Sequence, residues 1–181
     1  MTSSMEPLIL LPRDAPLLAS KANGIDDFED PRFQAFIDDL MRCGDENDGV
    51  GIAAPQVGKS IRLFIMAPKP NPRYPDAPVM EPTAIINPEI LNVSEEKEKG
   101  WEGCLSVPGF RGMVPRHLEI TVAYQDRTGQ HMRAHFSGFL ARLFQHEFDH
   151  LEGILFPDRM EKEDPLVTLE EFTAITGITV S

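Results

Sequence analysis

Apolar side chains recur at helical spacing in residues 31–45, PRFQAFIDDLMRCGD. These positions fall three or four residues apart and would form one stripe on an α-helix: Phe33, Phe36, Ile37, Leu40 and Met41. Asp30 is a suitable N-cap residue, and Pro31 suits the first helical position. We therefore predict a helix over residues 31–45 whose apolar stripe packs into the core.

A second helical pattern begins at Ser137 or Gly138 and runs through QHEFDHLE. Its apolar positions also share one side of a helix: Phe139, Leu140, Leu143, Phe144, Leu151 and Ile154. Gly153 is a natural residue to follow the end of this helix, because glycine tolerates the left-handed conformation found there. The pattern predicts a buried helix that would hold its polar side chains rigidly.

Strand-like apolar runs occupy 61–67, 84–93, 101–107, 118–124 and 131–136. The segment GVGIAAPQVG, residues 49–58, is rich in small residues and leads into the first run. The last two runs flank QDRTGQ, which is typical of a hairpin turn. Clusters of strands followed by a helix favour an α+β fold. We expect antiparallel or mixed sheets packed around the central helix.

The segment 68–82, PKPNPRYPDAPVMEP, contains six prolines and is predicted to be a loop that connects two strands. Residues 161–181 form a short acidic tail with one helix expected near TLEEFTAI. A chain of 181 residues suits a single catalytic domain. We expect its core to span residues 8–160.

Composition restricts the class of protein. Hydrophobic residues make up 41% and charged residues 25%, as in ordinary globular proteins. The net charge of −12 argues against direct nucleic-acid binding, which needs basic patches. No apolar run is long enough to cross a membrane, and the N-terminus does not resemble a signal peptide, so we expect a cytoplasmic monomer. Its two cysteines, Cys43 and Cys104, should then stay reduced, with Cys43 a small buried residue.

The stretch QHEFDHLEG, residues 145–153, places His146 and His150 four residues apart, with Glu147 directly after the first. Positions i and i+4 lie on one face of a helix, so both imidazoles can bind one metal ion. Glu147 is rotated by about 100° around the helix axis and would lie beside the ion, where a carboxylate can act as a general base for water. This H-E-x-x-H pattern indicates a metal-dependent hydrolase.

A catalytic site of this kind needs a third protein ligand and one open coordination position. Metzincin-type proteases supply a third histidine shortly after the motif, but that position is Phe156 here, which cannot bind a metal. Gluzincin-type proteases use a glutamate on a following helix, and Glu170 and Glu171 lie in the corresponding region. Cys104, in the segment EGCLS, is another candidate because a thiolate binds zinc or ferrous iron strongly. The residues alone leave the glutamate and cysteine alternatives open.

Three motifs together resemble the peptide deformylase family. The family pattern G-φ-G-φ-A-A-x-Q, with φ an apolar residue, is found at 49–56 as GVGIAAPQ. The family's E-G-C-L-S is found unchanged at 102–106, and its Q-H-E-x-D-H is found at 145–150. Their order and spacing also fit, and the resemblance extends from about residue 8 to about residue 160. The gluzincin alternative explains neither of the first two motifs.

The resemblance implies a metal site and a mechanism. Cys104 would be the third ligand beside His146 and His150 and would complete the site for one divalent ion. The ion would be iron(II) in the cell, with zinc, nickel or cobalt as substitutes. Glu147 would be the general base. The side-chain amide of Gln56 and the backbone N–H of Leu105 would stabilise the negative charge that develops on the formyl oxygen.

The resemblance also implies a substrate, the N-formyl-methionyl end of a nascent peptide on the ribosome, with formate as a product. The residues that would bind the methionine and the peptide are Val50, Gly51, Gly103, Arg111, Phe139, Arg142 and Leu143. The charged end of Arg142 should point to solvent or to a carboxylate, because a bare charge in an apolar pocket is unfavourable. We expect Asp149 to orient the helix, and the remaining histidines, His117, His131 and His135, to be structural.

Overall fold

The computed structural model describes residues 7–180. Within this range the chain forms three α-helices, eight strands and three short 3₁₀ segments. In chain order they are η1 (Pro16–Ala19), α1 (Pro31–Glu46), β1 (Gly51–Ala53), η2 (Ala54–Val57), β2 (Leu63–Met66), β3 (Thr83–Val93), β4 (Lys97–Cys104), β5 (Val107–His117), β6 (Glu119–Gln125), β7 (His131–Ser137), α2 (Gly138–Leu151), η3 (Phe156–Arg159), β8 (Val167–Thr168) and α3 (Leu169–Thr176).

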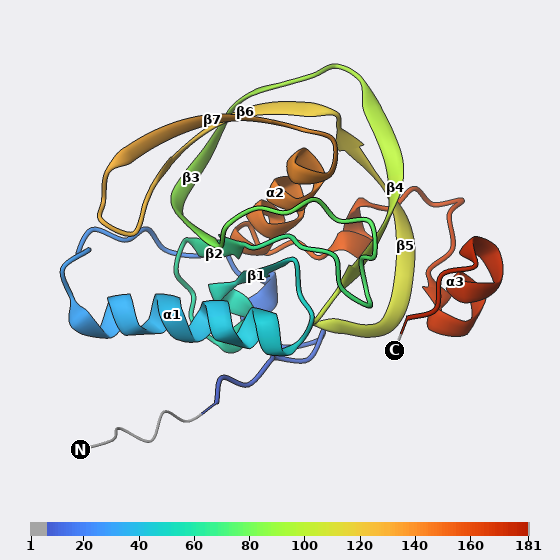
Figure 1. Cartoon of the computed structure of the whole chain (residues 1–181), viewed down its shortest axis with the longest axis horizontal. Coiled ribbons are helices and arrows are strands. Elements are labelled where there is room, and N and C mark those ends of the chain that lie inside the picture. The colour runs from blue at the N-terminus through green and yellow to red at the C-terminus, as the bar shows by residue number, and fades with distance from the viewer. Residues whose placement is uncertain (1–6, 181) are drawn as a thin grey trace.

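Two antiparallel sheets surround the helix α2. The larger sheet has the strand order β1-β2-β3-β6-β7 and curves over α2, while the smaller sheet has the order β4-β5-β8 (Figure 1). Every ladder between these strands is antiparallel. The predicted α+β fold with sheets around a central helix is therefore confirmed.

Strand periodicity distributes the core over both faces of the larger sheet. In β2, Phe64 and Met66 belong to the apolar cluster around α2, whereas Leu63 and Ile65 belong to the cluster that includes α1. Neighbouring residues of a strand point to opposite faces, so one short strand packs against both helices. On the α2 side, the rings of Phe64 and Phe144 meet edge to face with centroids 5.1 Å apart. This packing fixes α2, and with it the two histidines of the H-E-x-x-H motif.

The helix predicted over 31–45 is confirmed as α1. The side chain of Asp30 accepts a hydrogen bond from the backbone N–H of Arg32, and Pro31 occupies the first turn. Ile37 and Leu40 are fully buried, and the other predicted stripe residues pack against the same cluster. Cys43 is buried in that cluster, as expected.

The predicted strands are confirmed in three cases and corrected in two. Runs 84–93, 118–124 and 131–136 correspond to β3, β6 and β7. The run 61–67 is extended only over β2, Leu63–Met66. The run 101–107 is not one strand: it contains the end of β4, a turn, and the start of β5. The sequence prediction missed β5 because its prolines and glycines hide the alternation of a strand.

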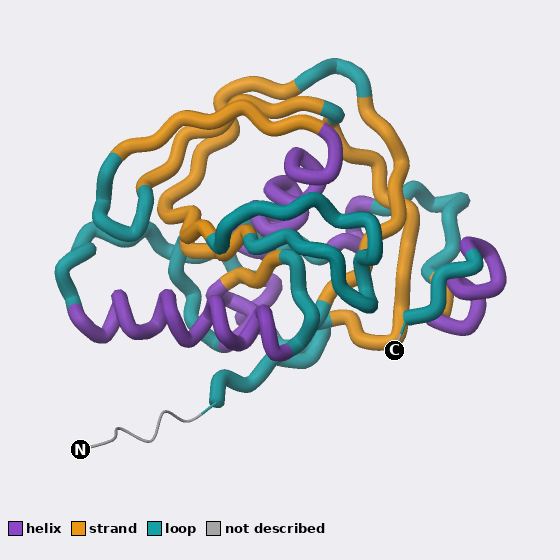
Figure 2. Tube along the Cα trace, in the orientation of Figure 1, coloured by secondary structure: helices purple, strands orange, loops and turns teal. Residues whose placement is uncertain are grey.

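The ends of the helices follow the local sequence signals. Gly153 adopts a left-handed conformation with φ of 77° just after α2, as predicted. Thr168 and Glu171 form a capping box at the start of α3, which confirms one short helix in the tail. The proline-rich segment 68–82 contains no helix or strand (Figure 2).

Candidate metal centre

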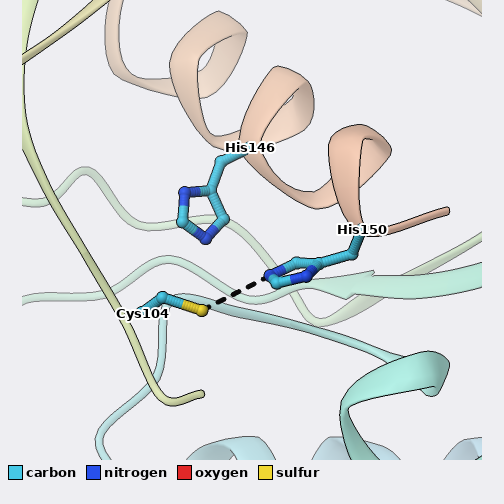
Figure 3. A group of neighbouring side chains, drawn as sticks. All are labelled: Cys104, His146 and His150. Carbon is cyan, nitrogen blue, oxygen red and sulfur yellow. Dashed lines mark hydrogen bonds between the residues drawn. The ribbon is translucent and has the colours of Figure 1, made fainter. Parts of the chain in front are cut away.

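Cys104, His146 and His150 converge on one point inside the molecule (Figure 3). Cys104 ends β4, and both histidines lie on the face of α2 that is turned toward it. One donor atom from each residue lies within 4.8 Å of the others. Among residues 7–180 this is the group of histidine, cysteine and acidic side chains with the geometry to hold a metal ion.

The electrostatics of the three donors favour an ionised thiol. Sγ of Cys104 lies 3.4 Å from Nε2 of His150. Burial raises the pKa of Cys104, but the charge of His150 and hydrogen bonds from both histidines outweigh it and hold that pKa well below its ordinary value. Burial lowers the pKa of His146, but hydrogen bonds to Cys104 and Glu102 hold it well above its ordinary value. A metal ion needs the thiolate and would take the place of the imidazole proton, so the donor set fits a divalent ion.

Glu102 holds His146 in position. Its Oε1 lies 2.8 Å from Nδ1 of His146, and both carboxylate oxygens accept hydrogen bonds from Arg116, at 2.9 and 3.0 Å. Burial raises the pKa of Glu102, but the hydrogen bonds from His146 and Arg116 hold it far below its usual range. The bond to Nδ1 leaves Nε2 of His146 free for a metal. Sequence reasoning missed Glu102, although a carboxylate two residues before a candidate ligand was an available signal.

Asp149 connects the same helix to its surroundings, as expected of a helix-orienting group. Its carboxylate accepts hydrogen bonds from Arg116 at 2.6 Å and from Arg159 at 2.9 and 3.1 Å. Arg116, only 5% exposed, thus lies between Glu102 on β4 and Asp149 on α2. The ion pairs tie the cysteine strand to the histidine helix.

Replacing Glu102 with glutamine should destabilise the metal-free protein at neutral pH by about 3 kcal/mol, because buried Arg116 would lose half of its compensating charge. The pKa of Glu102 is depressed by folding, so its stabilisation exists above the unfolded-state pKa of about 4.3 and is lost as the pH falls below it. The difference between wild type and Glu102→Gln in urea unfolding should therefore shrink toward about pH 3. Glu119→Gln, at an exposed carboxylate, is the control. A pH-independent difference would contradict this assignment.

Glu147 is 3% exposed, and its Oε2 has no hydrogen-bond partner in the described chain. Burial raises the pKa of its carboxyl, against the charges of His146 and His150. Gly51 makes room for it: a Cβ there would lie 2.8 Å from Oε1 of Glu147 and 2.8 Å from Cδ1 of Leu143. A buried carboxylate with an open oxygen can accept a proton from a molecule in the cavity.

Gln56 presents its amide N–H₂ to the cysteine. Its Oε1 accepts a hydrogen bond from the backbone N–H of Ala53 at 2.9 Å, which turns Nε2 toward Sγ of Cys104 at 3.5 Å and Oγ of Ser106 at 3.2 Å. The side chain is 1% exposed. Gln56 is thereby fixed as a donor beside the candidate metal ligands.

A cavity of about 250 Å³ opens onto these groups. The predicted site residues that line it are Val50, Gly51, Gln56, Gly103, Cys104, Leu105, Phe139, Arg142, Leu143, His146 and Glu147. The guanidinium of Arg142 donates through Nη1 to Glu102 at 2.7 Å and to the carbonyl of Val114 at 2.7 Å. The charged end therefore meets a carboxylate, as expected.

The sequence pattern of the polypeptide deformylase family matches residues 7–165. The chain belongs to this family. Peptide deformylase 2 of Nostoc sp. is 52% identical over 172 residues, which are 95% of each chain. A class I type b peptide deformylase from Acinetobacter baumannii has a similar structure, with a TM-score of 0.84, 42% identity, and coverage of 87% of this chain and 100% of that one. A second structure of that type, with Met-Ala-Ser bound, has a TM-score of 0.80 and 44% identity, and covers 84% of this chain and 98% of that one.

The family is one of hydrolases, and its members act on formylated nascent peptides. The possible triad of Cys104, His146 and His150 fits a single ion in such a deformylase. The glutamates of the gluzincin alternative lie elsewhere: Glu171 caps α3, and neither it nor Glu170 belongs to the metal-ligand group. No helix in residues 7–180 is long and apolar enough to cross a membrane.

Some residues that line the cavity of about 250 Å³ were not predicted from the sequence. Arg73 and Tyr74 come from the proline-rich loop, so this loop is more than a connector between strands. The hydroxyl of Tyr74 donates to the carbonyl of Gly103 at 3.2 Å, and its ring meets Phe139 edge to face. No local pattern signals such a contact between distant segments.

Two further groups of predicted residues lie outside this cavity. Arg111 lies against Gly103 but lines a neighbouring cavity instead. The remaining histidines stand apart from the metal-ligand group: His117 on β5 lies 2.6 Å through Nδ1 from the carbonyl of Ser94, and His131 and His135 lie on β7.

Proposed function

We propose that this protein removes the N-formyl group from the formyl-methionine of newly made polypeptides and releases formate. The observation that carries the proposal is the convergence of a thiolate and two imidazoles beside a buried carboxylate with an open oxygen, at the wall of one cavity. The enzyme would act as a single catalytic domain, as a cytoplasmic monomer, on substrates presented at the ribosome and without direct binding of nucleic acid.

Cys104, His146 and His150 would hold one divalent ion, which lowers the pKa of water and polarises the formyl carbonyl when bound. We propose iron(II) in the cell, and zinc, nickel or cobalt as substitutes, because a set of one thiolate and two imidazoles accepts all of these ions. Glu102 would keep His146 in the orientation that leaves its Nε2 free.

Glu147 would take the proton from the attacking water and later give it to the leaving amine. Its raised pKa suits this exchange, because a base works best when its pKa lies near the working pH. Gln56 and the backbone N–H of Leu105 would donate to the formyl oxygen as its negative charge grows. Gln56 needs little reorganisation, since Ala53 and Ser106 already fix its amide.

The methionine side chain would enter the apolar part of the cavity, between Val50, Phe139 and Leu143. The backbone N–H and C=O groups near Gly51 and Gly103 would form hydrogen bonds with the backbone of the extended peptide. A relative from Acinetobacter baumannii has a crystal structure with Met-Ala-Ser bound, which supports a peptide ligand for this protein.

Formyl-Met-Ala-Ser tests the proposal directly. The metal-loaded protein should release formate and leave Met-Ala-Ser intact, as followed by coupled formate detection and mass spectrometry. Acetyl-Met-Ala-Ser is the matched control. It should react far more slowly, because an acetyl group is larger than a formyl group and fits the enclosed position beside the metal ligands less well. Cleavage of a peptide bond without formate would show a protease instead.

A further inference from the structure

We call the cavity of about 250 Å³ that is lined by Cys104 and His146 the metal cavity. A second cavity, of about 170 Å³, adjoins it. Arg73, Tyr74, Trp101 and Phe139 line both cavities, so they form a shared wall. A peptide bound in the metal cavity would therefore place its following residues next to the second cavity.

Part of the wall of this second cavity comes from the C-terminal segment. Phe172 and Ile178 line it, and both follow the residues 7–165 that the family pattern covers. Phe172 is 4% exposed and meets the ring of Trp101 edge to face with centroids 5.2 Å apart. The cavity is thus built partly by a region of the chain outside the family's common pattern.

Arg111 lines the same cavity and is only 4% exposed. Its hydrogen bond within residues 7–180 goes to the carbonyl of Phe110 at 2.8 Å, and its guanidinium lies 5.9 Å from the centre of the Phe172 ring. No carboxylate in that range pairs with it, whereas the equally buried Arg116 pairs with Glu102 and Asp149. A buried guanidinium with unused donors favours an anionic ligand.

The charges around Arg111 add to this preference. Burial lowers the pKa of Arg111, and the positive charge of Arg73 also lowers it, while the charges of Tyr74 and Cys104 act in the opposite direction. Arg73 lies over the ring of Tyr74 at 5.5 Å and forms no ion pair in the described part of the chain. Asp76 also lines the cavity, but it is exposed and pairs with neither arginine. Two arginines thus line one small cavity in a protein whose net charge is −12.

We propose that the second cavity binds the side chain of one of the two residues that follow the formyl-methionine, and prefers one that ends in a carboxylate. The inference rests on the proposed function and adds a substrate class to it. The methylenes of a glutamate would contact the aromatic wall of Trp101 and Phe172, and its carboxylate would accept hydrogen bonds from Arg111, with Arg73 nearby. Aspartate would fit the same donors with a shorter reach.

Two pairs of substrates test the preference. Formyl-Met-Ala-Glu is compared with formyl-Met-Ala-Gln, and formyl-Met-Glu-Ser with formyl-Met-Gln-Ser, so that each pair differs in charge but hardly in shape. In at least one pair kcat/KM should favour glutamate by about tenfold, because hydrogen bonds between charged groups contribute more than neutral ones. Formyl-Met-Ala-Ser is measured in parallel.

Matched variants assign the effect to the cavity. Arg111→Gln and Arg73→Gln should each reduce the preference for glutamate toward equality. Arg133→Gln removes the same charge from an exposed position of β7 that lines neither cavity, so it should keep the preference. Arg73→Gln keeps the test valid if the buried Arg111 is needed for folding.

Equal kcat/KM for glutamate and glutamine at both positions, with formyl-Met-Ala-Ser still turned over, would overturn the inference and leave the proposed function standing. A preference that survives in both arginine variants would also overturn it. Absence of formate from every peptide would instead overturn the proposed function, and the inference with it.

Discussion

Replacing Glu147 with glutamine is expected to lower kcat for formate release by about a thousandfold, because the amide keeps the shape of the carboxylate but cannot accept a proton. The metal should stay bound, since the three donors of the ion are unchanged. Steady-state kinetics with formyl-Met-Ala-Ser and elemental analysis of the purified variant measure both quantities.

The same substitution should not weaken the fold. Folding raises the pKa of Glu147 by burial, so its ionised form destabilises the metal-free protein above the usual carboxyl range of about pH 4. Glutamine removes that cost, and the free energy of unfolding at neutral pH should be equal to or higher than that of the wild type. Loss of metal together with activity would make Glu147 a ligand rather than a base, and full activity would place the base elsewhere.

Replacing Cys104 with alanine is expected to have the larger effect. It removes one of three donors, so affinity for the metal should fall by more than the roughly 10- to 100-fold typical of losing an outer partner. Formate release should become undetectable at ordinary metal concentrations. Competition with a chromogenic chelator measures the affinity, and the formate assay measures the activity.

Two controls make the Cys104 result specific. Cys43→Ala changes the chain's other cysteine, which lies on α1, is buried in the cluster between α1 and β2 and does not line the metal cavity, and it should keep metal and activity. Glu170→Gln changes an exposed glutamate of the tail and should also keep both. Metal retention in Cys104→Ala with loss in Glu170→Gln would revive the gluzincin alternative.

The helices and the pairing of the two motif histidines on one helix face were predictable because their signals are local. The spacing of apolar residues from Phe33 to Met41 fixed the face of α1, and the i, i+4 spacing of His146 and His150 placed both on one face of α2. Glycine after α2 and proline within 68–82 mark the ends of regular structure. In these segments a few adjacent residues decide the conformation.

The rest of the site depends on contacts between distant residues. Glu102 on β4 forms hydrogen bonds with Arg116 of β5 and with Arg142 and His146 of α2. The antiparallel pairing of β4 with β5 brings Glu102 and Arg116 together. The contact of Tyr74 with Gly103 likewise depends on how the proline-rich loop folds back. Resemblance to the family pointed to Cys104 as the third candidate ligand but did not reveal the groups that orient the site.

X-ray absorption spectroscopy of the zinc-loaded protein tests the central claim most directly. The account predicts one sulfur at about 2.3 Å and nitrogen donors at about 2.0 Å from the zinc, with the sulfur absent in Cys104→Ala. It also predicts one light oxygen donor from solvent in the wild type. A zinc shell of nitrogen and oxygen alone in the reduced wild-type protein would contradict the account.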